Sequence, residues 1–231
     1  FTFYGDLQQG DVNVKFKGNI VNLIDNAEAN ININADSFDF DMKGNYRPGN
    51  NFDIRGTTNL NIKNMASFVD SFLSEESLFS QVKSDENLDV KGEFLISNEI
   101  TSFNKLVIDS DSIKGKANVD LLYGAGKKGE TQWDISLDIE KINTDSLRKA
   151  KDKPEKENPD LINYYVVSNS SFNLSSYHFE LPTNLSALFS LSIKEIVYNK
   201  DKISNILIDT DIFNGKAIIH SFSADLPGNS K

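Results

Sequence analysis

The chain has 231 residues, a formal net charge of −10, no cysteine and two histidines. This length suits one large domain or two small ones. Without cysteine there is no disulfide framework or thiolate metal site, and two histidines argue against a histidine-rich metal centre, so no cofactor is expected. The acidic balance argues against a nucleic-acid partner, and no apolar run approaches the ~18 residues of a membrane span.

Alternation of apolar and polar residues is the main pattern in the N-terminal part. It is clearest over residues 29–35, where Ala29, Ile31, Ile33 and Ala35 are separated by asparagines. A period of two predicts strands with one apolar and one solvated face, which antiparallel sheets allow. The same pattern occurs at Val12, Val14 and Phe16, at Phe38, Phe40 and Met42, at Leu60 and Ile62, and at Leu88 and Val90.

Glycines recur between or within these runs. Where a tight connection needs a positive φ, glycine is the preferred residue, so we interpret them as hairpin turns, with bulges inside long strands as the alternative. The glycine segments are Lys17-Gly18-Asn19, Lys43-Gly44-Asn45, Pro48–Asn51, Arg55-Gly56, Lys91-Gly92, Lys114-Gly115, Tyr123–Gly126, Asn214-Gly215 and Pro227-Gly228.

Residues 64–83 break the alternation. Met65, Phe68, Val69 and Phe72 follow helical spacing, and Asn64 is a suitable N-cap. We therefore expect one or two short helices that cover part of the sheet. A helix on a membrane surface is a weaker alternative, because this segment carries acidic residues and lacks a basic polar face.

The C-terminal part resumes the alternation after a charged interruption. Residues 133–140 alternate, 144–162 mix acidic and basic residues with two prolines, and apolar residues alternate again at 172–181. We expect a β-rich segment over 1–143, a charged linker or insertion over 144–162 that begins with a helical turn at 146–151, and a further β segment over 163–231.

An internal repeat supports an extensible sheet. Residues 108–117 and 208–217 are identical at six of ten positions. Each copy follows one strand-like run and leads into another, which is typical of repeated strand pairs. The sequence begins at Phe1 inside a strand-like run and stops at Lys231 just past an expected turn. We therefore expect it to be part of a longer protein, with the segment over 163–231 truncated at its end.

The sequence contains no motif that indicates a catalytic or metal-binding site. The pairs Asp109/Asp111 and Asp209/Asp211 fail the calcium-loop pattern, because glycine arrives at the seventh position rather than the sixth. His178 and His220, the two possible bases of a catalytic triad, lie near no nucleophile elbow. The predicted fold class is mainly β: a long, antiparallel, twisted, one-faced sheet, open as a trough or closed as a sandwich, with one or two short helices.

Several segments resemble the AsmA family of Gram-negative envelope proteins, namely Asn87–Leu122, Glu180–Lys200, Ile203–Ile208, Asn214–Ala217 and Ser223–Gly228. Members repeat an apolar strand, a short turn with glycine and a second apolar strand, and end in a Leu-Pro-Gly turn. The resemblance implies a periplasmic β-trough, anchored in the inner membrane by an N-terminal helix. It also implies a part in phospholipid transport between the membranes and in outer-membrane homeostasis, and it brings no catalytic residues.

The leading hypothesis is a non-enzymatic segment that shields lipid acyl chains in an apolar β-groove. Its expected partners are phospholipid or another acyl lipid, the inner membrane and envelope proteins. One alternative is a structural or adhesion β-sandwich domain of a cell-envelope or surface protein, and another is an unrecognised hydrolase. The candidate groove residues are Ile31, Ile33, Trp133, Ile135, Leu137 and Ile139.

Overall fold

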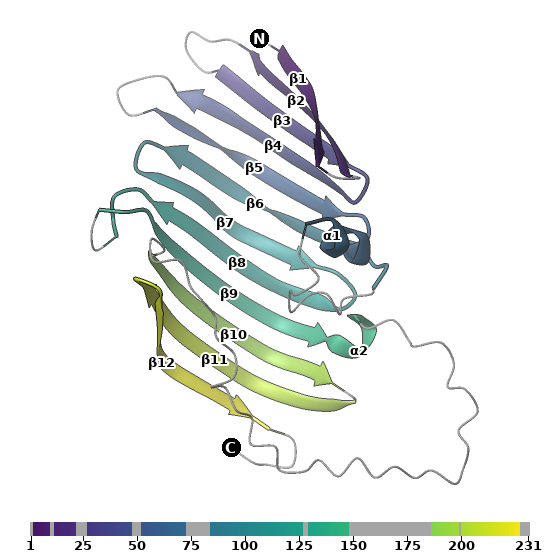
Figure 1. The fold of residues 1–231 in the computed structure, drawn as a ribbon, viewed down its shortest axis with the longest axis vertical. Helices are drawn as coiled ribbons and strands as arrows, with labels where there is room; N and C mark the ends of the chain where they lie inside the picture. Colours follow the sequence, from purple (N-terminus) through teal and green to yellow (C-terminus); the bar gives the residue numbers. More distant parts are fainter. Residues whose placement is uncertain are drawn as a thin grey trace, which may run out of the picture.

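Twelve strands form one sheet whose strand order follows the order of the chain (Figure 1). The computed structural model describes residues 2–9, 12–21, 27–47, 52–72, 84–126, 129–147, 186–198 and 200–226. The strands are β1 (Thr2–Gln9), β2 (Val12–Val21), β3 (Ala27–Ala35), β4 (Phe38–Arg47), β5 (Asp53–Ile62) and β6 (Leu88–Ser97). They continue with β7 (Ile100–Asp109), β8 (Ile113–Leu122), β9 (Gln132–Asn143), β10 (Ser186–Tyr198), β11 (Asp201–Phe213) and β12 (Lys216–Asp225).

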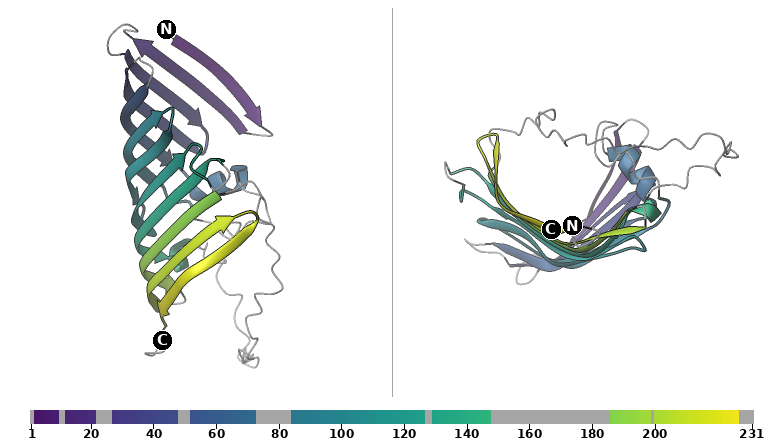
Figure 2. Two further views of the ribbon diagram at one scale, coloured as in Figure 1. Left: turned by 90° about the vertical axis from the view of Figure 1, so that its left-hand side faces the viewer. Right: turned by 90° about the horizontal axis from the view of Figure 1, so that it is seen from below.

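The sheet is open, twisted and curved. Seen end-on in Figure 2, it forms a trough with one concave and one convex face. All described strands belong to this single sheet, and the described helices are two short ones. The predicted fold class is confirmed, and the arrangement is the trough rather than the two packed layers of a sandwich.

Helix α1 (Met65–Phe72) lies on the concave side of the sheet, near one rim (Figure 2). The Asn64 side chain accepts a hydrogen bond from the Ser67 backbone N–H at 2.8 Å, which confirms the predicted N-cap. Met65 and Val69 are buried, and the Phe68 ring meets Phe38 edge-on with centroids 5.8 Å apart. The face that carries Phe38 is therefore the concave face.

The predicted helical segment is confirmed over 65–72, while residues 73–83 lie outside the described part of the chain. Neither described helix is long and apolar enough to cross a membrane.

One strand pair departs from the antiparallel expectation. Strands β9 and β10 are parallel, with Gln132 opposite Ser186, whereas every other pair of neighbours is antiparallel. A parallel pair requires a crossover rather than a hairpin, and residues 144–185 make this connection. Alternation predicts the faces of a strand but not its direction, so this pair was not foreseen.

The crossover begins in α2 (Thr144–Leu147), two residues earlier than the helical turn expected at 146–151. The Thr144 hydroxyl donates to the Val197 carbonyl oxygen at 2.7 Å, and the Asp145 carboxylate accepts from the Lys200 backbone N–H at 2.9 Å. These bonds attach α2 to the end of β10. Residues 148–185, which include most of the predicted charged linker and the alternating run at 172–181, lie outside the described part.

Most of the strand-flanked glycines are not turns. Gly18, Gly44, Gly56, Gly92 and Gly115 lie inside β2, β4, β5, β6 and β8, so the interpretation as hairpin turns is wrong for them. A short polar segment such as Lys-Gly-Asn occurs both in hairpin turns and inside strands, so the sequence alone does not distinguish the two.

Two predicted turns are confirmed. Asn214 and Gly215 have φ values of 52° and 72° and connect β11 to β12, as expected for a two-residue hairpin turn. Gly124, at φ 73°, lies in the connection between β8 and β9. The segments at Pro48 and Pro227 lie outside the described residues.

The structural correspondence between the two copies lies three residues before the internal repeat and does not extend through it. Lys105 in β7 and Asn205 in β11 share a left-handed backbone, with φ of 52° and 51°, and each marks a β-bulge. The two copies then diverge, since β7 ends at Asp109 whereas β11 continues to Phe213. The bulge is thus repeated and the turn is not.

The sheet has little enclosed core. Among the described residues, the largest side chains that are almost completely shielded from solvent are two serines, Ser102 and Ser112. One buried apolar cluster consists of Ile139, Ile193 and Ile206, with half-buried neighbours on the same three strands and on β7 and β12. A single curved layer explains this, because nothing in the described part of the chain packs over most of its apolar face.

Candidate functional site: the apolar concave face

The concave face carries a continuous apolar row that crosses ten strands. Directly opposed residues on neighbouring strands point to the same face, so the strand pairing shows which side chains are neighbours. From β2 to β11 this row contains Phe16, Ile33, Phe40, Leu60, Val90, Ile108, Gly115, Ile139, Ile193 and Ile206.

The six predicted groove residues all lie on this face. Ile31 and Ile33 of β3 are opposite Met42 and Phe40 of β4. The other four, Trp133, Ile135, Leu137 and Ile139, follow one another at alternate positions of β9. The structure does not bring the two groups together, because β3 and β9 are six strand spacings apart, or roughly 29 Å along the sheet.

Burial on β9 decreases toward one rim. Ile139 is buried between Gly115 and Ile193, and Leu137 packs beside it. Trp133 lies at the other end of the strand and is 36% exposed, between Leu121 and Ala187. The predicted packing position of Trp133 is therefore a partly uncovered one at the margin of the face.

Sequence reasoning missed the apolar residues that follow a bulge. In β7, Phe103 and Leu106 are three positions apart yet share the concave face, because a bulge lies between them. The same holds for Ile203 and Ile206 of β11. Strict alternation breaks at these points, and Lys105 and Asn205, which adopt the left-handed backbone, give no signal by composition alone.

Where β4 and β5 pair, the concave face has positions without a side chain and is partly polar. Gly44 of β4 and Gly56 of β5 are directly opposed, so the sheet carries no side chain at that pair. A Cβ at Gly44 would lie 2.7 Å from the Arg55 carbonyl oxygen and 2.8 Å from Cζ of Phe94, whose ring covers the bare backbone. Thr58 lies nearby, with its buried hydroxyl lacking a hydrogen-bond partner.

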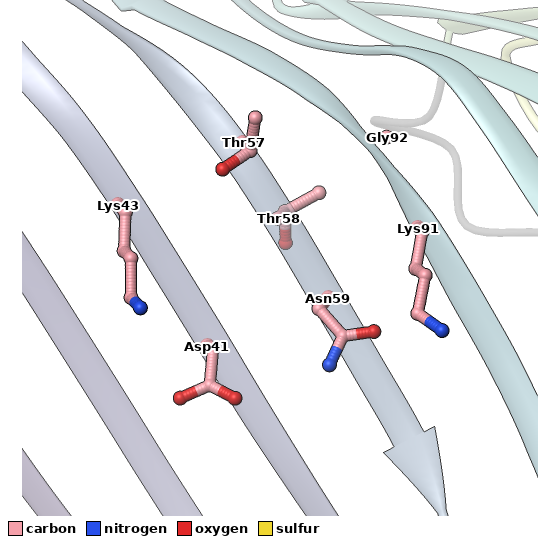
Figure 3. Close-up of a pocket in the computed structure, with 7 residues that line it drawn as sticks. All are labelled: Asp41, Lys43, Thr57, Thr58, Asn59, Lys91 and Gly92. Carbon is pink, nitrogen blue, oxygen red and sulfur yellow. The ribbon is translucent and has the colours of Figure 1, made fainter.

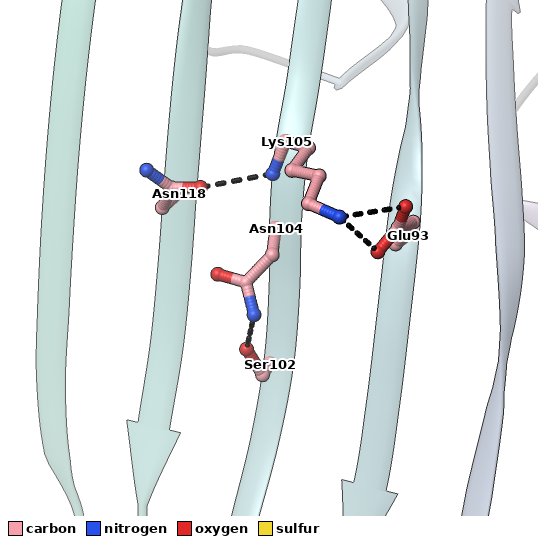
Figure 4. Close-up of polar contacts among 5 residues, drawn as sticks. All are labelled: Glu93, Ser102, Asn104, Lys105 and Asn118. Atoms are coloured by element: carbon pink, nitrogen blue, oxygen red, sulfur yellow. Dashed lines mark hydrogen bonds and ion pairs between the residues drawn. The ribbon is translucent and has the colours of Figure 1, made fainter.

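The convex face is mainly polar, although Val107, Leu188, Leu207 and Ile218 lie exposed on it. In Figure 4, the Lys105 ammonium binds both carboxylate oxygens of Glu93 at 3.0 Å, and its backbone N–H donates to Asn118 at 2.9 Å. Asn104 donates to the Ser102 hydroxyl beside them.

A shallow hollow of about 390 Å³ lies on the same convex surface. In Figure 3, Lys43 and Lys91 flank the β5 residues Thr57 and Asn59 that line it. The hollow is also lined by Asp41, Thr58 and Gly92. Charged and amide groups therefore predominate in this part of the convex face, while the continuous apolar row lies on the concave face.

The acidic motifs lie in ordinary cross-strand contacts. Asp109 pairs with Lys114 at 3.4 Å, Asp209 accepts from the Ser221 hydroxyl at 2.6 Å, and His220 lies 3.0 Å from Asp211. Across the described ranges, no group of three or more His, Asp or Glu side chains is placed to hold a metal ion. His178 lies outside the described part.

Two carboxylates are electrostatically perturbed. Hydrogen bonds from Lys63 and then Asn34 hold the pKa of Asp39 below its usual value, and the ion pair with Lys63 spans 2.8 Å. A hydrogen bond from Lys202 likewise lowers the pKa of Glu195. Both carboxylates are thus favoured in the charged, hydrogen-bonded form, the opposite of the raised pKa that a general acid needs.

Comparison of the chain with known protein families, with characterised proteins and with solved structures found no match. The apolar concave face is the feature on which a functional proposal rests.

Proposed function

We propose that this chain is a non-enzymatic lipid-binding segment whose concave face shields acyl chains from water. The observation that carries the proposal is the apolar face on the inside of the trough, over most of which no described residue packs. Large exposed apolar surfaces on soluble chains mark binding sites for apolar ligands, membranes or partners. Among these occupants, acyl chains fit a long apolar strip between polar margins.

The dimensions suit this ligand. Twelve strands at a spacing of ~4.8 Å give the face a length of roughly 50 Å. Burial contributes ~0.8 kcal/mol per methylene, so ten shielded methylenes are worth about 8 kcal/mol before the cost of immobilising the chain. Binding of this kind is passive, and any direction of transfer comes from other components.

The charge distribution points to acyl-chain recognition rather than recognition of an anionic headgroup. The chain carries a net charge of −10, and the cross-strand ion pairs, such as Lys105 with Glu93, are on the convex face. A phospholipid would lie with its acyl chains on the concave strand faces and its headgroup in solvent at a rim.

The AsmA-like motifs support a setting for this activity. In that setting the segment lies in the periplasm, the full-length protein is anchored in the inner membrane, and the bound ligand is phospholipid moving toward the outer membrane. Envelope proteins would be the further partners, and the contribution would be to outer-membrane assembly or homeostasis.

Native mass spectrometry with lipid extraction tests the proposal. The chain is purified without detergent from a Gram-negative host, together with Leu137→Asp and Ser136→Asp. These neighbours in β9 alternate in direction, so the same charge is added to the concave face in one variant and to the convex face in the other. We expect phospholipid with the parent chain and with Ser136→Asp, and at least a tenfold loss with Leu137→Asp.

A lipid-free mass for the folded parent chain would overturn the proposal and favour the structural or adhesion alternative. Equal lipid content in folded Leu137→Asp would show that lipid binds somewhere other than this face. Circular dichroism of both variants establishes that they are folded.

A further inference from the structure

Strand β12 is an edge of the sheet with unusually exposed apolar residues. Within the described part of the chain it pairs with β11 alone. Ile218, Ile219 and Phe222 are 55%, 64% and 68% exposed, although their partners on β11 are at least partly covered. A long apolar edge strand is a template for pairing with another strand.

A bulge in the middle of β12 divides its side chains into two halves. Ile219 is opposite Thr210 and Ser221 is opposite Asp209, so His220 is the extra residue. Ala217 and Ile219 face the concave side before the bulge, and Phe222 and Ala224 do so after it. The concave positions are therefore odd-numbered in one half and even-numbered in the other.

We propose that β12 pairs antiparallel with β12 of a second copy of this chain, in the register in which the two residue numbers sum to 441. The two-fold axis passes through the bulge. The opposed pairs are Lys216 with Asp225, Ala217 with Ala224, Ile218 with Ser223, Ile219 with Phe222, and His220 with Ser221.

The bulge selects this register. Residues that oppose each other in an antiparallel pair share a face, and all the pairs above satisfy this condition. A shift by one residue places Ala217 of the concave face opposite Ser223 of the convex face. A shift by two places Ile219 opposite His220, so the faces disagree at the centre.

Charge and apolar contacts favour the same register. Lys216 of each copy lies opposite Asp225 of the other, so two opposite-charge pairs close the two ends of the interface. Asp225 is held at its end of the strand by a 2.8 Å hydrogen bond from Asn205. At the centre, Ile219 and Phe222 each gain an apolar neighbour on the concave face, where they are now exposed.

The dimer would extend the concave face. With the two-fold axis perpendicular to the sheet, both concave faces open to the same side and two twelve-stranded sheets become one of twenty-four strands. The pairing itself does not depend on the identity of any ligand.

Charge reversal tests the pairing by sedimentation equilibrium at low ionic strength. Lys216→Asp and Asp225→Lys each create two like-charge pairs, and we expect the dimer dissociation constant to rise about tenfold in each. The double variant Lys216→Asp/Asp225→Lys restores opposite charges and is expected to return the constant to within about threefold of the parent. Circular dichroism serves as the folding control.

Cysteine cross-linking tests the register. The chain has no cysteine, so Lys216→Cys and Asp225→Cys introduce the only thiols. Opposed Cα atoms in an antiparallel pair lie within reach of a disulfide. We expect oxidation of a mixture of the two variants to give mainly the mixed disulfide dimer.

A parent chain that stays monomeric at all concentrations, a dimer unaffected by both reversals, or preferential cross-linking of Asp225→Cys to Thr2→Cys on β1 would each overturn the proposal.

Discussion

Side chains cover the backbone of the concave face in two different ways toward the two ends of the sheet. On β9–β11, which we call the aliphatic region, Ile139, Ile193 and Ile206 lie side by side and are buried. On β2–β6, the glycine region, strand positions are bare at Gly18, Gly44, Gly56 and Gly92. The Phe3 ring lies over Gly18 and the Phe94 ring over Gly44.

The difference shows how a single layer protects its backbone without a second layer. In the aliphatic region, branched side chains cover one another across strands. In the glycine region, a ring from a neighbouring strand (Phe3 over Gly18) or from the strand after it (Phe94 over Gly44) covers the backbone. This close approach depends on the absence of a Cβ at the glycine. Stability should therefore depend on side-chain volume in one region and on backbone clearance in the other.

The largest effect is expected in the aliphatic region. Ile193→Ala removes a side chain that is 7% exposed, and should lower the free energy of unfolding by about 3 kcal/mol. The matched change Ile33→Ala, at a half-buried position of β3, should cost about 1 kcal/mol. Urea unfolding followed by circular dichroism measures both, and equal losses would mean that the two regions do not differ.

The glycine region should respond to added rather than removed volume. A Cβ at Gly56 would collide with the Lys43 carbonyl oxygen and the Gly44 Cα, which are backbone atoms, so Gly56→Ala should cost about 2 kcal/mol. At Gly18 the colliding atoms belong to the Phe3 ring, which can rotate away, so Gly18→Ala should cost less than about 1 kcal/mol.

The same unfolding assay compares these two variants. A larger loss of stability for Gly18→Ala than for Gly56→Ala would show that the aromatic rings, and not the backbone atoms, limit the space for a Cβ.

The smallest effect concerns pH at the rim of the glycine region. Because Lys63 lowers the pKa of Asp39 in the folded state, this contact stabilises the fold above the unfolded pKa near 3.8, and the contribution is lost as the pH falls through the lower folded pKa. Asp39 is one-third exposed, so about 0.5 kcal/mol is expected. The stability difference between the parent and Lys63→Met at pH 6 should shrink below pH 4, and a constant difference would contradict this assignment.

The sequence was sufficient for the faces of the strands and insufficient for their connections. The alternation at Phe38, Phe40 and Met42 correctly predicted that these side chains share one face of β4, because a period of two is a local property of the chain. The bulges at Lys105 and Asn205 were not predicted, because neither residue type demands a left-handed backbone.

The candidate site was predicted in outline only. Ile31 and Leu137 were placed on the correct face, but their separation along the sheet depends on the strand order, which alternation does not determine. The internal glycines were predicted only as the alternative to hairpin turns, and this alternative holds at Gly92 and Gly115, which lie at register shifts. The role of the other internal glycines depends on which residue opposes them. The role of Gly44 becomes evident only when the strand pairing places Gly56 opposite it.

The parallel pairing of β9 and β10 has a consequence for the order of folding. Most neighbouring strands are joined by short connections, whereas Gln132 meets Ser186 only after residues 144–185 have closed a loop. Closing about 40 residues instead of about 3 costs roughly 2 kcal/mol more in chain entropy. We therefore expect β10–β12 to form their own hairpins first and to join the edge at β9 as a unit, in the slowest step of assembly.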